Sequence, residues 1–452
     1  MRLCAPALRL LATLSLLSLG CSWSRFSDDT SNAPVVLLQK PGKISGFGAA
    51  LATTHDASGA ALLVAGSAGS LYNLGTGDSP GFDAIDITYC DPSSEQCSAS
   101  IPLAGLPSAL GPGTSVHSPR CFIGGAGSLG GKNGFIVRCS DAVEFVLPMP
   151  SSPAQQLTFD LSVQQADDTS SVADGSADPS VLATGSTSRS VRDAWFYPPG
   201  LASFGSLTMP SDLAQALGTD ASYGTTLAVL VVGGARIYAV GAPTSGDVLL
   251  WRSDGGTASA FLGCLGGVAG FGRALASGKV NRDADDDLVL SDADNVHVLD
   301  GRVLSTLPET SASVCSFSAL PAGALLGSFS CGSSKSLSDC AASSFGASLA
   351  VGDLDGDGDG EVIVGAPGMT VRGKHNAGAL LVFDVERPSD TLFADAKFLS
   401  SAEEGDGLGT ALCAPHLADR DVIAAAGPSS GKVALFYCSS LLAPGKGGER
   451  CP

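Results

Sequence analysis

The residues best suited to chemistry are five carboxylates that alternate with other residues over nine positions, in the run Asp353-Leu-Asp355-Gly-Asp357-Gly-Asp359-Gly-Glu361. Without a cation, so many negative charges in one short loop would repel one another. Calcium accepts about six to eight oxygen ligands, and the intervening glycines allow a loop to wrap around such an ion. The run therefore predicts a calcium site, and the alternative is a solvated Asp-Gly turn.

The same spacing occurs in the first half of an EF-hand loop, which lies between two helices. Here Phe345-Gly346 precedes the acidic run and Val362-Ile-Val364 follows it. Short β-branched runs bounded by glycine are typical of strands. We therefore expect a strand-loop-strand calcium site and exclude an EF-hand.

A second acidic run is a degenerate copy of the first. Its candidate ligands are Asn281, Asp283, Asp285 and Asp287. Lys279 stands where the first run has Asp353, and Ala284 replaces a turn glycine. A cation at the first ligand position favours a metal-free loop, in which the Lys279 ammonium would neutralise the aspartates. The alternative is a weaker calcium site on the remaining oxygens.

The elements around the best acidic run recur along the chain. Each copy has a Phe-Gly-like turn, a short apolar strand, a loop, a second strand, a Gly-Ala-Pro-like turn and a third strand. The clear copies are 47–66, 223–251, 270–299, 345–383 and 407–437. Two fainter copies, 121–138 and 157–197, fill the long interval, so the sequence predicts seven units.

These strands are apolar throughout rather than alternating, which indicates burial on both faces. One small unit cannot cover both of its own faces, but units stacked radially can, and closing the ring removes exposed edges. We therefore predict an all-β, seven-bladed β-propeller. Residues 35–38, ahead of the first copy, are expected to complete the last blade. A sandwich or an open solenoid is the alternative.

The order of Phe-Gly, Asp-rich loop and Gly-Ala-Pro in Phe345–Pro367 resembles the FG-GAP repeats of integrin α-subunit propellers and their bacterial relatives. The resemblance implies a seven-bladed propeller with calcium between the first two strands of some blades. It further implies the roles of the ligands: side-chain oxygens from Asp353, Asp355, Asp357 and Glu361, and the backbone carbonyl of Asp359. Glu361 stands where the family usually has Asp.

The N-terminus has the layout of an export signal, with Arg2 and Arg9 before an apolar run that ends near Cys21. It resembles a bacterial lipoprotein signal, in which Cys21 would be the lipidated first residue, although Ser18 stands where Leu is usual. Ordinary cleavage nearby and an uncleaved anchor are the alternatives. The expected organisation is a signal over 1–20, a linker over 21–34, the propeller over 35–440 and a tail over 441–452.

Cysteine content agrees with an oxidising compartment, because thirteen cysteines include several close neighbours and no CxxC pair. Disulfides are expected between neighbours, with Cys264–Cys315 as a weaker assignment that leaves Cys451 unpaired. The neighbouring pairs are Cys90 with Cys97, Cys121 with Cys139, Cys331 with Cys340, and Cys413 with Cys438.

The net charge of −19 excludes a basic surface for nucleic acid, and we expect membrane contact only through the lipid anchor. No nucleophile elbow, Walker loop or HExxH motif occurs, and the five histidines are scattered. The sequence thus favours a monomeric, non-catalytic adhesion scaffold in the periplasm or on the bacterial outer membrane or cell surface, with an unidentified protein or glycan ligand. A propeller-based polysaccharide lyase or glycosidase and a purely structural envelope protein are the alternatives.

Overall fold

The computed structural model describes the strand backbones between residues 35 and 197, with the side chains of residues 51, 182 and 194–196. From 205 to 436 it also describes side chains, except at residues 216, 218–221, 268–269, 311–314, 332–341, 355–357, 372 and 386–403 and at several residues after 414.

The described strands form antiparallel sheets, and in most of these sheets strands that follow one another along the chain are neighbours. From the innermost strand outwards, the first three sheets are β2 (Phe47–His55), β3 (Ala61–Asn73), β4 (Phe82–Asp91) and β5 (Gln96–Cys97), with β6 (Ile101–Pro102) also on β4; β7 (Phe122–Leu129), β8 (Lys132–Cys139), β9 (Ala142–Leu147) and β10 (Gln155–Phe159); and β11 (Asp167–Ala173), β12 (Val181–Ser188), β13 (Val191–Tyr197) and β14 (Gly205–Ser206). In the same direction, the next two sheets are β15 (Thr226–Val232), β16 (Ala235–Ala242), β17 (Asp247–Ser253) and β18 (Ala260–Gly266); and β19 (Leu275–Gly278), β20 (Asp287–Ser291), β21 (Asn295–Leu299) and β22 (Leu325–Ser330). The last two are β23 (Ser348–Gly352), β24 (Glu361–Ala366), β25 (Ala379–Phe383) and β26 (Ala394–Ala396); and β27 (Ala411–Cys413), β30 (Ile423–Gly427), β31 (Lys432–Phe436) and β1 (Val35–Gln39).

Short elements fill some connections between these strands. They are α2 (Ser211–Leu217), α3 (Gly301–Ser305), a 3₁₀ turn at Phe317–Ala319, and a small ribbon of β28 (His416–Leu417) and β29 (Arg420–Asp421).

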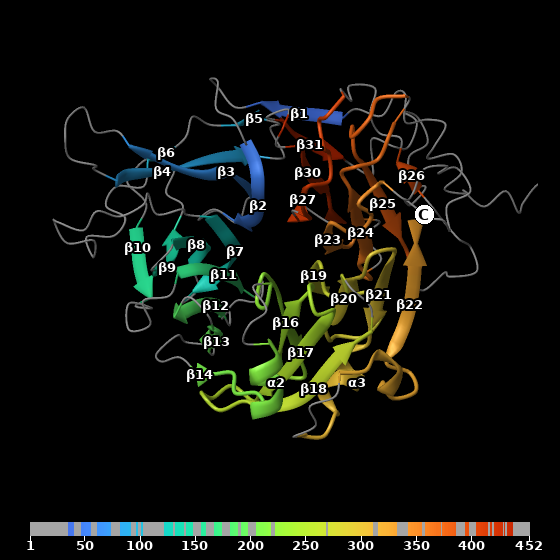
Figure 1. Cartoon of the computed structure of the whole chain (residues 1–452). Coiled ribbons are helices and arrows are strands. Elements are labelled where there is room, and N and C mark those ends of the chain that lie inside the picture. The colour runs from blue at the N-terminus through green and yellow to red at the C-terminus, as the bar shows by residue number, and fades with distance from the viewer. Residues whose placement is uncertain are drawn as a thin grey trace, which may run out of the picture.

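The sheets are arranged around a central axis, with one edge strand of each sheet nearest the centre (Figure 1). Contacts join these innermost strands in the closed order β2, β7, β11, β15, β19, β23, β27 and back to β2. This radial arrangement is a β-propeller, which confirms the predicted all-β architecture and excludes a sandwich or an open solenoid.

The first and last described strands join in one sheet. Strand β1 pairs antiparallel with β31, in a register that places Val35 opposite Phe436. The prediction that residues 35–38 complete the last sheet is therefore confirmed. Because this pairing joins the two ends of the ring, opening the ring requires breaking a ladder of backbone hydrogen bonds.

The predicted start of one faint repeat is wrong. Residues 157–163 were expected to begin a repeat, but β10 (Gln155–Phe159) pairs with β9 as the outer strand of the preceding sheet. The innermost strand of the next sheet is β11, whose sequence is Asp-Asp-Thr-Ser-Ser-Val-Ala. Such a polar strand lacks the apolar run by which the other copies were found.

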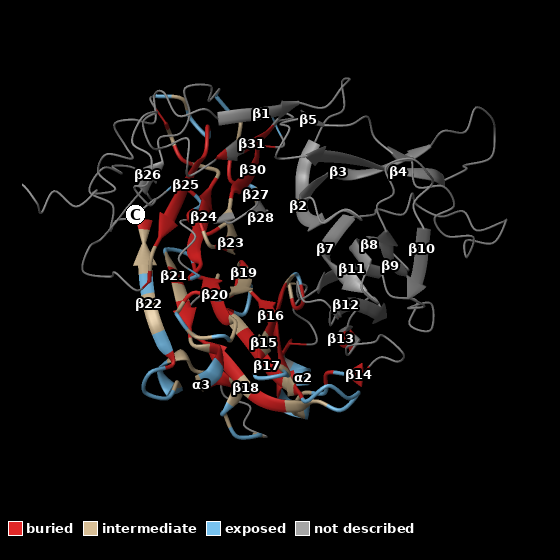
Figure 2. Ribbon diagram, turned by 180° about the vertical axis from the view of Figure 1, so that it is seen from behind, coloured by how far each residue is buried: buried red, intermediate tan, exposed pale blue. Residues whose placement is uncertain are grey.

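The apolar strands are buried because each sheet packs between two others. In β16, Ile237 and Ala239 belong to a core shared with the following sheet, whereas Tyr238 and Val240 belong to a core shared with the preceding sheet. Figure 2 shows the described strands β16, β20 and β24 coloured as buried. Full burial of a large apolar side chain contributes about 1.5–3 kcal/mol, so both faces stabilise the ring.

The glycine of the Phe-Gly turn is required by its backbone conformation. Gly346 has a φ of 78° and donates its N–H to the carbonyl of Gly365 at 2.9 Å. A Cβ at this position would lie 2.7 Å from the Cβ of Ser291 in the preceding sheet. The turn therefore needs glycine both for left-handed φ and for close packing between sheets.

Two of the expected disulfide pairings receive support. Cys264 and Cys315 are bonded, which confirms the weaker assignment. In the ladder between β4 and β5, Cys90 lies directly opposite Cys97, the register that the expected cross-strand pairing requires. Cys331 is also disulfide-bonded, but its expected partner lies outside the described residues.

The expected pairing of Cys413 with Cys438 is wrong, because Cys413 is a free thiol. Cys413 ends β27, and β30 lies between β27 and β31, the strand after which Cys438 follows. Two strand spacings of about 4.8 Å separate the outer pair of strands, beyond the usual Cα separation of a disulfide.

Candidate metal centre

The predicted calcium loop connects an innermost strand to the second strand of its sheet. Asp353 directly follows β23, and Glu361 is the first residue of β24, opposite Gly352 in the ladder. The ladder thus brings the first and last predicted ligands close together, at the end of β23. Asp355 and Asp357 lie outside the described residues.

Two described carboxylates close the loop on itself. Asp353 Oδ2 accepts the N–H of Gly358 at 3.0 Å, and Glu361 Oε2 accepts the N–H of Leu354 at 2.8 Å. Glu361 is only 4% exposed, and Gly358 has a φ of 97°. Because these bonds anchor the loop at both ends, Asp353 and Glu361 are held in defined positions.

The Asp359 carboxylate faces the neighbouring loop. Its Oδ2 accepts a hydrogen bond from Arg282 Nε at 2.9 Å, and the residue is 8% exposed. This ion pair occupies the side chain of Asp359, which is compatible with a ligand role for its backbone carbonyl. The donor set of carboxylate and carbonyl oxygens is the type that calcium prefers, so the residues present fit this ion.

The second acidic loop, between β19 and β20, is held by hydrogen bonds and an arginine. Asn281 Oδ1 accepts the N–H of Asp283, and Asp283 Oδ1 accepts the N–H of Asp285, each at 2.9 Å. Arg302 of α3 donates Nε to Asp285 at 3.1 Å and places Nη2 3.4 Å from Asp283. A guanidinium therefore neutralises two of the candidate ligands.

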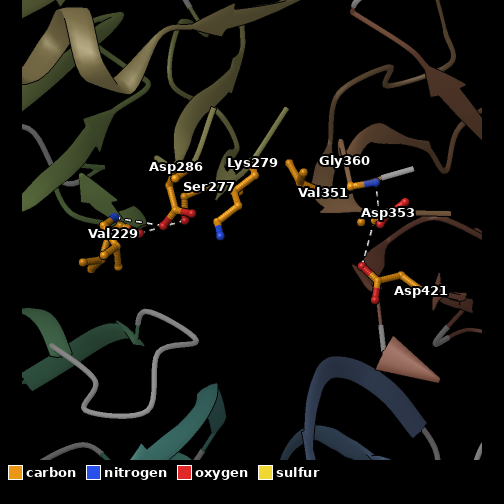
Figure 3. A pocket seen from close by; sticks show the side chains of 13 residues that line it. Val229, Ser277, Lys279, Asp286, Val351, Asp353, Gly360 and Asp421 are labelled. Carbon is orange, nitrogen blue, oxygen red and sulfur yellow. Dashed lines mark hydrogen bonds between the residues drawn. The ribbon is translucent and has the colours of Figure 1, made fainter. Parts of the chain in front are cut away.

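Lys279 does not take the position that the sequence suggested. No described contact joins its ammonium to Asp283, Asp285 or Asp287, and Figure 3 shows its side chain extending into a cavity instead. Arg302, which is distant in sequence, takes over the expected neutralisation. In the described structure the cation that pairs with this loop is therefore Arg302 and not the predicted Lys279.

The carboxylate of Asp287, the last candidate ligand of this loop, is buried and bound to backbone groups. It is fully buried, and its two oxygens accept the N–H groups of Val280 at 3.1 Å and Gly301 at 3.0 Å. Burial raises the pKa of this carboxyl to about 7, although the two N–H groups oppose the shift. Both oxygens thus bind backbone and hold α3 against β20.

Hydrogen bonds to backbone groups join the acidic loop to both neighbours around the ring. Gly360 donates its N–H to the carbonyl of Lys279 at 2.6 Å. On the other side, Asp421 Oδ2 accepts the N–H of Asp353 at 2.8 Å, and the Asp421 N–H donates to the Asp353 carbonyl at 2.7 Å. The loops therefore form one continuous layer at this end of the axis.

A cavity of about 660 Å³ lies within this layer (Figure 3). Its charged lining residues are Lys279, Asp286, Asp353 and Asp421, and its apolar lining includes Val229, Val231 and Val351. Asp286 is positioned by the N–H of Val231, which its Oδ2 accepts at 2.9 Å. The volume lies in the usual range for small-molecule sites, and the candidate calcium loop forms one wall.

The candidate calcium loop lies within the stretch that matches a known family. Residues 345–383 match the family described as FG-GAP repeat. These residues form an FG-GAP repeat. The match includes the turn at Gly346, the whole acidic loop, and β23 to β25, and it confirms the resemblance noted in the sequence.

Solved structures similar to this FG-GAP repeat chain are distant. The structure of BBS1N in complex with ARL6DN shares 11% identity at a TM-score of 0.49, over 90% of this chain and 98% of that one. The Aleuria aurantia lectin in complex with Fucalpha1-6GlcNAc shares 9% identity at a TM-score of 0.39, over 75% of this chain and 93% of that one. NirN, a dihydro-heme d1 dehydrogenase, shares 12% at 0.37, over 74% and 54%. No curated protein matches the sequence.

Sequence reasoning missed the residues that connect the FG-GAP repeat to its neighbours. Asp421 lies outside both acidic runs, yet it binds the backbone of Asp353. Arg282 and Arg302 carry no motif. The only signal in the sequence is a positive charge close to several aspartates, and this signal does not show which aspartate each arginine contacts.

The predicted lipidation of the N-terminus receives no structural test. The proposed lipidation site, Cys21, lies outside the described residues. Within the part of the chain that is described, no helix is long and apolar enough to cross a membrane.

Proposed function

We propose that this chain is an exported, seven-bladed, calcium-binding propeller that acts as a non-catalytic binding scaffold. The observation that carries the proposal is the position of the acidic loop. It belongs to an FG-GAP repeat and forms one wall of a cavity at the end of the axis. Calcium bound there would order a surface on which a ligand can dock.

The closed order of innermost strands supports the number of blades. The contacts run from β2 through β27 and return to β2, and β1 completes the final sheet. Among the strands that the structure describes, seven sheets of at least four strands take part in this ring.

Calcium has a structural role in this proposal. At one to ten times the dissociation constant, a bound ion adds about 0.4–1.4 kcal/mol to the free energy of unfolding. Thermal unfolding of the wild type in calcium and in EDTA should show a matching difference. Asp353→Asn should abolish the difference, whereas Asp254→Asn, at an exposed aspartate of another loop, should retain it.

An identical calcium response in the wild type and in Asp353→Asn would contradict the assignment of the loop. An absent response in the wild type at millimolar calcium would contradict calcium binding altogether.

The ligand is proposed to be a protein or a glycan. Arrays of glycans and of envelope proteins, probed in calcium and in EDTA, test binding. Turnover assays of the glycans that bind separate a scaffold from a lyase or glycosidase. Binding without turnover is the expected result, and cleavage products would overturn the non-catalytic assignment.

Export is proposed from the N-terminal signal and Cys21. The full chain expressed in a Gram-negative bacterium should partition into detergent, and Cys21→Ser should move it to the aqueous phase. Retention of both forms in the cytoplasm would contradict export.

A further inference from the structure

A second cavity, of about 290 Å³, lies at the other end of the innermost strands. Strand β15 contributes Leu227 to this cavity and Val229 and Val231 to the larger one. Likewise, Leu349 of β23 lines the smaller cavity and Val351 the larger one. The two cavities therefore lie towards opposite ends of the same strands, and this one is remote from the acidic loops.

The lining of the smaller cavity is a set of leucines from equivalent positions. Each follows the glycine of its Phe-Gly-like turn by three residues, so the repeat places one leucine at this position in each of five sheets. They are Leu51, Leu227, Leu275, Leu349 and Leu412. Except for Leu227, they are only half-buried, so the cavity presents apolar surface to solvent.

The hydroxyl groups in this lining already have partners. Thr226 Oγ1 donates to the carbonyl of Gly272 at 2.6 Å, and Ser348 Oγ donates to the carbonyl of Gly409 at 2.5 Å. Each bond joins one sheet to the turn of the next. These two hydroxyl groups form part of the cavity wall. The lining contains one charged group.

That group is the Arg273 guanidinium. Arg273 follows the turn glycine, where the clear copies around the ring have alanine or threonine. One Nη donates to the carbonyl of Phe345, while Nε is buried and has no hydrogen-bond partner in the described structure. An unpaired buried donor is costly, so Arg273 is the polar group of this lining whose hydrogen bonding is incomplete.

The electrostatic surroundings leave the guanidinium charged. Burial lowers the pKa of Arg273, while the nearby carboxylates of Asp292 and Asp294 act in the opposite direction. Asp292 is itself occupied, because it accepts the N–H groups of Asp294 and Asn295 and contacts His297. The cavity thus combines an arginine cation with an apolar wall.

We propose that this cavity binds a short aliphatic carboxylate, with the carboxylate on Arg273 and the hydrocarbon chain within the leucines. A guanidinium and a carboxylate form strong, charge-assisted hydrogen bonds, and leucine side chains gain by covering methylene groups. The volume equals that of about ten water molecules, which suits a chain of the size of octanoate. The site extends the proposed scaffold function and does not depend on calcium.

Titration of octanoate into the full-length protein by calorimetry, in EDTA, tests this site. Octanoate should bind, whereas octylamine and octanol should bind at least about tenfold more weakly, because neither offers a carboxylate to the guanidinium. Equal affinity for the three compounds, or no octanoate binding at millimolar concentration, would overturn the proposal. Because the buffer lacks calcium, this result is separable from a failure of the calcium assignment.

Two arginine variants test whether Arg273 binds the carboxylate. Arg273→Gln should weaken octanoate binding by at least about tenfold. Arg252→Gln, which alters a half-buried arginine outside this cavity, should leave binding unchanged. Unchanged binding in Arg273→Gln contradicts the proposal. If that variant does not fold, the comparison of the three compounds on the wild type still decides.

Discussion

Arg282 Nε lies 2.9 Å from Asp359 Oδ2 and thereby joins two acidic loops of successive sheets. A second bond, from the Gly360 N–H to the Lys279 carbonyl, connects the same loops through their backbones. The degenerate loop is therefore part of the support of the intact one. Breaking the pair between Arg282 and Asp359 is therefore expected to loosen both loops.

The first prediction concerns the identity of the cation in the degenerate loop. Lys279→Asp alone should add no second calcium-binding event, because Arg302 still pairs with Asp283 and Asp285. Lys279→Asp combined with Arg302→Gln should add one, since both positive charges are then removed. Calcium titration by calorimetry measures the stoichiometry.

A second event in Lys279→Asp alone would show that Arg302 does not block the loop. In that case the lysine, as the sequence first suggested, is the residue that excludes the metal. The wild type provides the reference stoichiometry.

The second prediction compares two glycines with positive φ. Gly346→Ala should lower the free energy of unfolding by about 2–5 kcal/mol, through left-handed strain and overpacking against Ser291. Gly233→Ala should lower the free energy of unfolding by only about 1 kcal/mol. Gly233 also has a positive φ, of 55°, but no atom lies within 4 Å of an added Cβ, so only the backbone strain remains. Urea unfolding of both variants measures the difference. Equal losses would mean that close packing at the Phe-Gly turn is unimportant.

The third prediction concerns acid stability. Burial alone would raise the pKa of Asp292, but hydrogen bonds from Asp294, His297 and Asn295 outweigh it and lower the pKa. A lowered folded-state pKa means that this stabilisation is present above the unfolded value of about 3.9 and is lost as the pH falls towards the folded value. Asp292→Asn should therefore reduce the loss of stability below about pH 4.

Unfolding free energies of the wild type and Asp292→Asn, measured from pH 6 downwards, test this sign (a range chosen around the ordinary carboxyl pKa of about 3.9). Parallel curves would show that Asp292 has the same pKa in the folded and unfolded chains. Asp254→Asn, at an exposed aspartate, serves as the control.

The fourth prediction concerns the Cys264–Cys315 disulfide, whose cysteines are 51 residues apart. Closing a loop of that length restricts the unfolded chain by about 4 kcal/mol in the chain-entropy treatment. The double variant Cys264→Ala/Cys315→Ala should lose a stability of that order under oxidising conditions. Cys413→Ala, at a free thiol, should lose much less, and similar losses in both would contradict the constraint.

The repeat grammar was readable from the sequence because each feature is local. Phe-Gly turns, apolar strands and the run Asp353–Glu361 each depend on residues within one repeat. The need to bury both faces of every small sheet then required a ring, and this argument predicted the pairing of residues 35–38 with the last sheet. Strand β11 was not predicted, because its polar sequence lacks the apolar run that marks the other strands.

By itself, the sequence determined the propeller architecture and the position of the acidic loop, since periodicity and spacing express local backbone preferences and burial. The tertiary structure alone decided that Arg302 rather than Lys279 neutralises the degenerate loop, and that Cys413 is unpaired behind an intervening strand. It also decided that leucines from separate repeats surround the Arg273 cavity. These outcomes depend on distances between sheets that are remote in the chain, and only ring closure sets those distances.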